Sequence, residues 1–152
     1  MNATPDAHVV TSRSISQEAA VALVEAAIAA SAAEGIAMAV AVTDSGGHLK
    51  AFASMDGTPF LATDVAVDKA WTATSFGVPT HTWTEIVAQP ASAQLAHRPR
   101  LVAVGGGFPI VADGAVVGGL GLSGGSAEQD ARAAVVALEA LGFTTEDEKE
   151  SR

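Results

Sequence analysis

The chain has 152 residues, of which 49% are hydrophobic but only 5% aromatic, and its formal net charge is −9. This length fits one domain, whose core must consist mainly of Ala, Val, Leu and Ile. Because cysteine is absent, disulfide frameworks and thiolate chemistry are excluded. The acidic balance disfavours nucleic acid and anionic membranes as partners.

The two ends differ in composition from the rest of the chain. Residues 1–13 form an expected flexible lead-in without the pattern of an export or transit signal, which predicts a cytoplasmic location. Residues 144–152 form a charged tail that is too polar for a core. Apolar stretches are all shorter than the roughly 18 residues of a membrane helix. We therefore expect a single domain over residues 14–143.

A helix and an antiparallel hairpin are predicted for the first third of the chain. The capping-box pattern of Ser14 and Gln17, with a glycine at the far end, predicts a helix over about residues 15–34. Large and small apolar residues then alternate over 36–42, which predicts a strand covered on both faces. Residues 48–54 are expected to form its hairpin partner.

Two helices are predicted next. Thr58 and Pro59 suit the N-cap and first turn of a helix that ends near Phe76, and Thr82 with Glu85 forms the capping-box pattern of a shorter one. Alanines recur along the longer helix at a spacing that allows close approach to a sheet. They are Ala62, Ala66, Ala70 and Ala73.

Glycine is densest at residues 105–125, which contain nine of the fifteen glycines. Within this stretch, residues 111–118 have the pattern of a strand, an Asp-Gly turn and a second strand. Ser126 and Gln129 then form the capping box of a last helix. Glycine inside strands serves either close packing or the close approach of a ligand, and both explanations stay open here.

The expected order of elements is helix, hairpin, two helices, hairpin and helix. Sequential hairpins do not build a parallel doubly wound sheet. We therefore predict an α+β fold in three layers, α/β/α, with a central antiparallel sheet and helices on both faces.

Several side chains are candidates for chemistry. Lys69 lies among alanines, where partial burial would favour base or Schiff-base work, and the alternative is a structural ion pair with an acid. Asp64 and Asp68 lie four residues apart on a helix, where they either hold a hard cation or complement the helix dipole. Backbone amides at Gly105, Gly106 and Gly107 could hold a carboxylate.

Each of the four histidines could ligate haem iron axially, and the alternative is an ordinary surface histidine. They are His8, His48, His81 and His97. None of them forms the i,i+4 pair that is typical of metal sites on helices.

Three ordered motifs resemble the GlcG/HbpS family, whose relatives include the C-terminal domain of PduO-type corrinoid adenosyltransferases. The motifs are VTDSGGHLKAFASMDG, DVAVDKAWTATSFGVPT and GGGFPIVADGAVVGGLGLSGGSAEQD, and the match extends from about Gly35 to Asp130. The positions that match the family pattern are Asp44, Gly47, Asp56, Gly57, Lys69, Thr72, Thr80, Gly106, Gly107, Pro109, Gly114, Gly118, Gly121, Ser123, Gly124, Gln129 and Asp130.

The resemblance implies a profilin-like fold with a five-stranded antiparallel sheet, and a homo-oligomer, either a dimer or a larger ring. Some members bind haem or are linked to its degradation or sensing, and others belong to catabolic operons. A histidine in the first helix ligates haem in some relatives, but here that helix contains none. The paired glutamates that bind iron in exported relatives are replaced at best by Asp64 and Asp68.

Three functions follow as hypotheses. The first is binding of haem or another flat carboxylated molecule beside the glycines at 105–107, with arginine charge for the acid groups. The predicted ligand-binding residues are Gly105, Gly106, Gly107, Phe108, Pro109, Arg98, Arg100, Thr72 and Ser123. The second is a cofactor-independent enzyme of small organic or aromatic acid catabolism, with Lys69 as acid/base and Asp44 or Asp56 as its partner. The third is an oligomeric accessory protein without catalysis.

Overall fold

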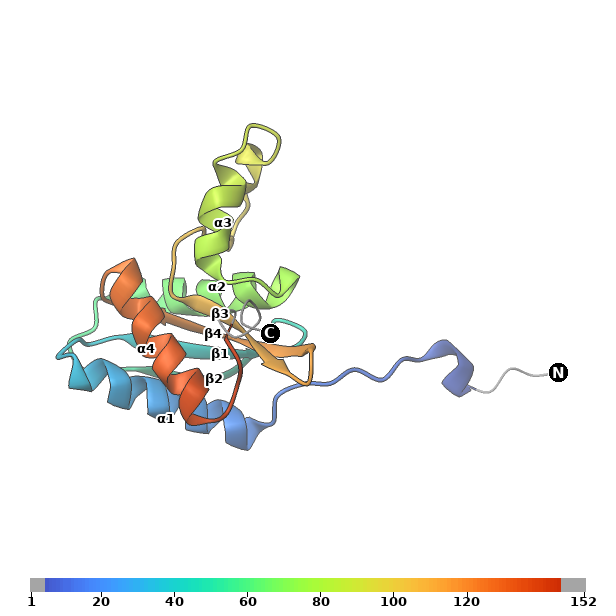
Figure 1. Cartoon of the computed structure of the whole chain (residues 1–152), viewed down its shortest axis with the longest axis horizontal. Helices are drawn as coiled ribbons and strands as arrows, with labels where there is room; N and C mark the ends of the chain where they lie inside the picture. Colours follow the sequence, from blue (N-terminus) through green and yellow to red (C-terminus); the bar gives the residue numbers. More distant parts are fainter. Residues whose placement is uncertain (1–4, 146–152) are drawn as a thin grey trace.

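A four-stranded antiparallel sheet lies at the centre of the computed structural model, which describes residues 5–145 (Figure 1). The strands are β1 (Ala39–Asp44), β2 (Leu49–Ser54), β3 (Gly107–Ala112) and β4 (Ala115–Ser123), in the spatial order β2-β1-β4-β3. The helices are α1 (Gln17–Ala33), α2 (Phe60–Phe76), α3 (Thr80–Val87) and α4 (Ala127–Ala140), with short 3-10 helices η1 (Pro5–His8) and η2 (Ala93–His97). The predicted order of helices and hairpins is confirmed.

The predicted number of five strands is wrong, since the sheet described over residues 5–145 has four. The segment between α3 and β3 contains η2 and turns. The Thr72 hydroxyl on α2 donates to the carbonyl of Arg100 and accepts from the amide of Val102, both at 3.1 Å. These bonds hold the segment against α2 as a loop.

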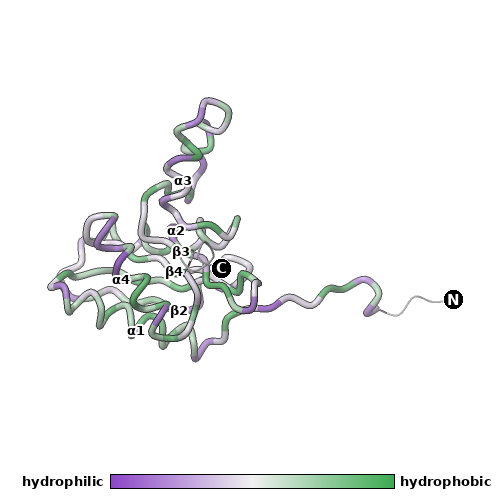
Figure 2. Tube along the Cα trace, in the orientation of Figure 1, coloured by the Kyte–Doolittle hydropathy of each residue, from purple (hydrophilic) through white to green (hydrophobic). Residues whose placement is uncertain are grey.

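Helices cover both faces of the sheet, as predicted (Figure 1). The larger side chains of β1, such as Val40 and Val42, face α1 and α4 and belong to the main core. On the other face, Ala39 and Ala41 pack against the alanine stripe of α2. Figure 2 shows apolar residues along the strands of the sheet, and a mixture of apolar and polar residues in the projecting segment with α3.

Because β4 contains glycines, the main chain of α2 can pack directly against the main chain of the sheet. A Cβ atom on Gly121 would overlap the carbonyl oxygen of Ala66, and one on Gly119 would overlap the carbonyl oxygen of Ala70. In this part of the chain, glycine serves close packing rather than ligand approach.

The turn of the second hairpin is formed by Asp113 and Gly114, whose φ angles are 49° and 77°. Two positive φ angles match the twist of a two-residue hairpin, which explains the Asp-Gly sequence. The capping box of Ser126 and Gln129 at the start of α4 is also confirmed. The first helix begins later than predicted, with Ser16 as its N-cap.

The chain before α1 is exposed from residue 5 to residue 14, and it extends away from the sheet (Figure 1). Ile15 is the first buried residue, and its amide donates to the Val117 carbonyl at 2.8 Å. Residues 1–4 of the predicted lead-in and 146–152 of the predicted tail lie outside the described residues. No helix within 5–145 has the length and hydropathy of a membrane span.

Asp44 organises the turn between β1 and β2. Its Oδ1 accepts hydrogen bonds from the amides of Gly46 at 2.9 Å and His48 at 3.0 Å, and the His48 ring nitrogen Nδ1 lies 3.2 Å away. Partial burial alone would raise the pKa of the Asp44 carboxyl, but these hydrogen bonds and the charge of His48 outweigh it and lower the pKa below 3.8.

Asp44→Asn should lower the free energy of unfolding by about 1 kcal/mol at pH 7, because the amides lose a charged acceptor. The pKa of Asp44 is lower in the folded state than in the unfolded state. The stabilisation is therefore present above the unfolded pKa and is lost as pH falls through the folded pKa. Urea unfolding at pH 7 and pH 3 should show the difference between the two proteins shrinking, and an equal difference at both pH values would contradict this account.

Candidate functional site

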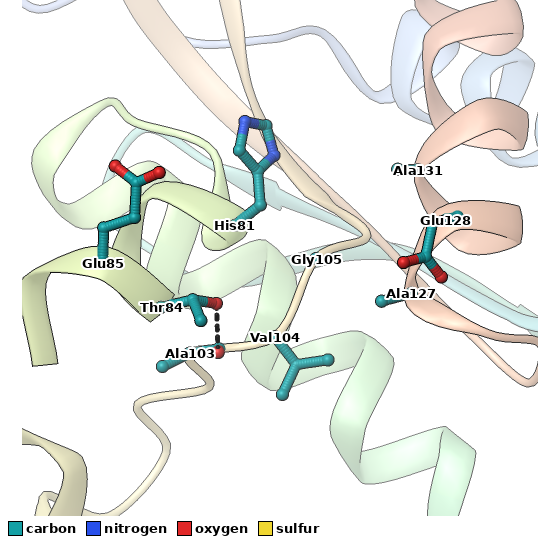
Figure 3. A pocket seen from close by; sticks show the side chains of 9 residues that line it. All are labelled: His81, Thr84, Glu85, Ala103, Val104, Gly105, Ala127, Glu128 and Ala131. Carbon is teal, nitrogen blue, oxygen red and sulfur yellow. Dashed lines mark hydrogen bonds between the residues drawn. The ribbon is translucent and has the colours of Figure 1, made fainter. Parts of the chain in front are cut away.

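A cleft of about 600 Å³ lies where α3 projects from the body of the molecule (Figure 3). One wall belongs to α3, one to the loop before β3 and one to α4. The lining residues are His81, Thr84, Glu85, Ala103, Val104, Gly105, Ala127, Glu128 and Ala131. We call this space the α3–α4 cleft; its volume lies in the usual range of small-molecule sites, about 300–1,000 Å³.

A second hollow of about 490 Å³ adjoins the α3–α4 cleft. His81 and Ala131 line both spaces, so the two hollows meet at these side chains. The other residues that line the second hollow are Glu34, Phe108, Arg132, Val135, Val136 and Thr145.

His81 is exposed at this junction because of how α3 begins. The helix starts at Thr80 with Pro79 as its N-cap, whereas the predicted N-cap was Thr82. Thr80 is buried, and its hydroxyl accepts a hydrogen bond from the Gly107 amide at 2.9 Å, which fixes the first turn against β3. The next side chain, His81, therefore points outward, with its ring edge-on to Phe108 at a centroid distance of 5.9 Å.

The three glycines at 105–107 have different surroundings. A Cβ on Gly105 would lie 3.5 Å from the His81 Cβ and 3.6 Å from the Ala127 Cβ, between the two helices of the cleft. On Gly106 it would lie 2.8 Å from the Nζ of Lys69, and on Gly107 2.6 Å from the Lys69 carbonyl oxygen. Only Gly105 lines the cleft, while Gly106 and Gly107 allow close packing beneath it.

Lys69 forms a buried ion pair with Asp130. Both side chains are 2% exposed, and the Lys69 Nζ lies 2.9 Å from the Asp130 Oδ2 and 2.9 Å from the Leu122 carbonyl oxygen, to which it donates. The Asp130 Oδ1 accepts a hydrogen bond from the Gly125 amide at 2.9 Å. The pair therefore joins α2, β4 and α4 beneath the α3–α4 cleft, an arrangement that favours the structural role for Lys69.

The two acids predicted as partners of Lys69 lie in other places. Asp44 bonds the β1–β2 turn, and Asp56 is exposed after β2. The acid that contacts Lys69 is Asp130. Catalysis by Lys69, Asp44 and Asp56 stays a prediction that this geometry does not favour.

Asp68 is paired with an arginine. The Arg100 Nε donates to its Oδ1 at 2.9 Å, and the Arg100 guanidinium lies 4.6 Å from the centre of the Trp71 ring. Asp64 is exposed on the same helix. Residues 5–145 contain no group of three or more side chains suited to hold a metal ion, so the metal site at Asp64 and Asp68 stays a prediction.

The remaining predicted ligand-binding residues are distributed over several environments. Phe108 lines the second hollow, whereas Pro109 and Ser123 are buried in strands. Thr72 ties the loop before β3 to α2, and Arg98 lines a separate small pocket. Of the nine predicted residues, the structure brings Gly105 and Phe108 to the two hollows.

The sequence analysis did not predict that Arg132 belongs to this site. Arg132 lines the second hollow, and its Nε and Nη2 donate to the two carboxylate oxygens of Glu34 at 3.2 and 3.3 Å. The available signal was the row of Ala127, Ala131 and Val135 at i,i+4 spacing, which gives α4 a small apolar face beside Arg132.

Comparison with known proteins gives a consistent family assignment. Residues 15–139 match the model of a family described as haem degrading protein HbpS-like. An uncharacterised 15.0 kDa protein encoded between dhaT and dhaS in Citrobacter freundii is 38% identical over 101 residues, which are 64% of this chain and 71% of that protein. GlcG of Escherichia coli K12 is 33% identical over 109 residues, or 72% of this chain and 81% of GlcG.

The corrinoid adenosyltransferase PduO of Salmonella typhimurium is 33% identical over 114 residues, which are 72% of this chain but only 34% of PduO. Two solved structures are similar. The alignment with a double mutant of Streptomyces reticuli HbpS has a TM-score of 0.86 and 30% sequence identity. It covers 93% of this chain and 97% of the HbpS chain. A PduOC–heme complex has a TM-score of 0.80 and 29% identity, and covers 87% of this chain and 98% of its own.

Proposed function

Because the chain belongs to the haem degrading protein HbpS-like family, we propose that it binds haem, or another flat carboxylated molecule, across the α3–α4 cleft and the second hollow. The observation that carries this proposal is the exposed imidazole of His81 at the junction of the two hollows. A single histidine suffices as an axial ligand of haem iron.

The side chains around His81 suit a flat ring. Gly105, Ala127 and Ala131 present little side-chain volume beside it, and the buried Phe108 ring packs edge-on against the imidazole. In Figure 3 the His81 side chain extends from the first turn of α3, with Glu85 of the same helix on one side and Ala131 and Glu128 of α4 on the other. A macrocycle would cover the small residues, and His81 would meet its iron.

The charges favour one orientation of the ligand. Glu85 and Glu128 line the α3–α4 cleft and would repel acid groups there. Arg132 lines the second hollow, where its planar guanidinium already forms two hydrogen bonds with Glu34. A carboxylate of haem would compete with Glu34, which lines the same hollow, for the guanidinium of Arg132.

The PduOC–heme complex supports this proposal because a similar domain holds heme. The first helix of the present chain has no histidine, whereas His81 lines both hollows, so His81 is the residue that would hold the haem iron there. The predicted homo-oligomer and cytoplasmic location stay predictions. The enzymatic and accessory roles likewise stay predictions.

Titration of the protein with hemin should give a saturable, shifted Soret band. His81→Ala should remove the spectral shift and weaken hemin binding by at least about tenfold, the equivalent of 1.4 kcal/mol. His97→Ala is the matched control, because His97 is exposed in η2 and lines neither hollow. A spectrum identical to that of free hemin would reject haem binding, and an unchanged spectrum of the His81→Ala complex would reject the assigned ligand.

A further inference from the structure

A third pocket, of about 200 Å³, lies where α3 and η2 meet the C-terminal half of α2, and it shares no residue with the α3–α4 cleft or the second hollow. Its lining is almost wholly apolar. The apolar side chains that line it are Trp71, Phe76, Trp83, Leu95 and Leu101. We call it the α2–η2 pocket. Because a polar group would lose its hydration there, the pocket suits an apolar side chain.

The opposite end of α2 presents two apolar side chains to solvent. Phe60 is 93% exposed and Leu61 is 68% exposed, and both belong to the first turn of the helix. An apolar cavity of about 150 Å³ holds a benzene molecule, so the ring of a phenylalanine fits the α2–η2 pocket. Within one molecule Phe60 cannot reach the pocket, because it lies at the other end of a helix about 25 Å long.

Phe60 and the α2–η2 pocket lie on the same outward face of α2. Side chains at steps of three or four residues form a stripe along this face, which consists of Phe60, Asp64, Asp68, Trp71 and Ser75. The alanines of α2 occupy the opposite side, against the sheet. Figure 1 shows α3 projecting on the side of α2 that faces away from the sheet. The outward face of α2 and the projecting segment therefore enclose a corner that is open to a partner.

The two ends of the stripe carry opposite charges. Asp64 is exposed one turn after Phe60, and Arg98 is exposed at the α2–η2 pocket. Neither forms an ion pair with a residue in the described part of the chain. Since the lining of the pocket is apolar, the stem of Arg98 lines it and the guanidinium extends into solvent. Asp68, between the two ends, is already paired with Arg100 at 2.9 Å.

The projecting segment has little core of its own. Helix α3 buries only Thr80 and Trp83, and η2 buries no residue. Helices of this length derive most of their stability from packing against other elements. A partner seated at the α2–η2 pocket would supply such packing.

We propose that a second copy of this chain docks on this face, with the two α2 helices antiparallel about a two-fold axis. Phe60 of each copy enters the α2–η2 pocket of the other, and Asp64 pairs with the partner's Arg98. In a two-fold interface every contact occurs twice, so a helix with the apolar side chain at one end and the pocket at the other is self-complementary. The axis passes near Asp68, whose charge Arg100 neutralises. This interface does not rest on the haem proposal.

Sedimentation velocity over a range of protein concentrations tests the apolar contact. Wild type should form a dimer, or an even-numbered assembly of such dimers. Phe60→Asp should weaken self-association by at least about a hundredfold, because it places a charge in the apolar pocket. Val10→Asp is the matched control, since Val10 is also 93% exposed but lies in the chain before α1, and this variant should associate as wild type does.

An exchange of charges tests the antiparallel arrangement. Asp64→Arg and Arg98→Asp should each weaken self-association by about tenfold, because each places like charges opposite one another. The double variant Asp64→Arg/Arg98→Asp should restore it. Both residues are exposed, so these replacements keep the fold.

Three results would overturn the proposal: a wild type that is monomeric at every concentration, unchanged self-association of Phe60→Asp, or a double charge variant that associates no better than the single ones. A monomeric wild type would leave this face to a different protein. Phe60, Asp64 and Arg98 line neither the α3–α4 cleft nor the second hollow, so the hemin titration is decided separately.

Discussion

Lys69→Met is expected to lower the free energy of unfolding by about 3–5 kcal/mol, because it leaves the carboxylate of Asp130 buried without its cation. The methionine retains most of the apolar contacts of the lysine stem, so the change removes mainly the charge. The loss also frees the Leu122 carbonyl, which accepts a hydrogen bond from Nζ. Urea denaturation measures the difference.

A double-mutant cycle separates the ion pair from other effects. Asp130→Asn alone should also destabilise the protein, since it leaves the ammonium of Lys69 without a counter-charge. The double variant Lys69→Met/Asp130→Asn removes both charges and should be more stable than Lys69→Met by at least about 1 kcal/mol. Lys50→Met, at an exposed lysine of β2, serves as control and should stay within about 0.5 kcal/mol of wild type.

The cycle also tests the role of Lys69. If Lys69→Met unfolds with the same free energy as wild type, the ion pair contributes nothing and the structural role is wrong. A large loss of stability with strong coupling to Asp130 would mean that any loss of activity in a Lys69 variant has to be corrected for unfolded protein before it is assigned to chemistry.

Gly121→Ala is expected to lower the free energy of unfolding by about 3 kcal/mol, through forced displacement of α2. The new Cβ would overlap the carbonyl oxygen of Ala66 and lie 2.6 Å from the amide nitrogen of Ala70. These are backbone atoms in the middle of a helix, which cannot move singly. Removal of a glycine from a strand would otherwise stabilise the protein by about 0.5–1 kcal/mol, so the sign of the effect identifies the cause.

Gly105→Ala is the matched control for this prediction. Its Cβ would meet the nearest atoms at 3.5–3.6 Å, which is ordinary contact distance, and its φ is not in the left-handed region. We expect its stability to lie within about 1 kcal/mol of wild type. Thermal or urea unfolding of the two variants side by side would contradict the packing account if both were equally stable.

Local patterns predicted the two hairpins well, because each depends on residues close in sequence. The Asp113–Gly114 turn requires two positive φ angles, and alternation along 36–42 reflects a strand whose faces meet different partners. The alanines of the α2 stripe likewise recur at helical spacing, and they all lie on the buried face of the helix. Each of these patterns lies within one hairpin or helix, and together they were sufficient to predict the α+β class.

The family resemblance led to one wrong prediction about the fold. It implied a fifth strand, whereas the segment before β3 lies against α2 through bonds from Thr72, a residue about thirty positions earlier. The predicted N-cap at Thr82 is wrong for a similar reason, since the observed N-cap is Pro79, three residues earlier, where the buried Thr80 meets Gly107. Side chains from another element decided both boundaries.

The amino-acid sequence by itself determined the order of elements, the small face of the sheet and the glycines that make it small. Only the tertiary structure decided that Lys69 pairs with Asp130, that His81 and Arg132 lie at adjoining hollows, and that Arg98 lines a different pocket. The physical reason is that periodicity reports which face of an element is buried. It carries no information on which side chains from distant elements meet, because packing of whole helices on the sheet decides that.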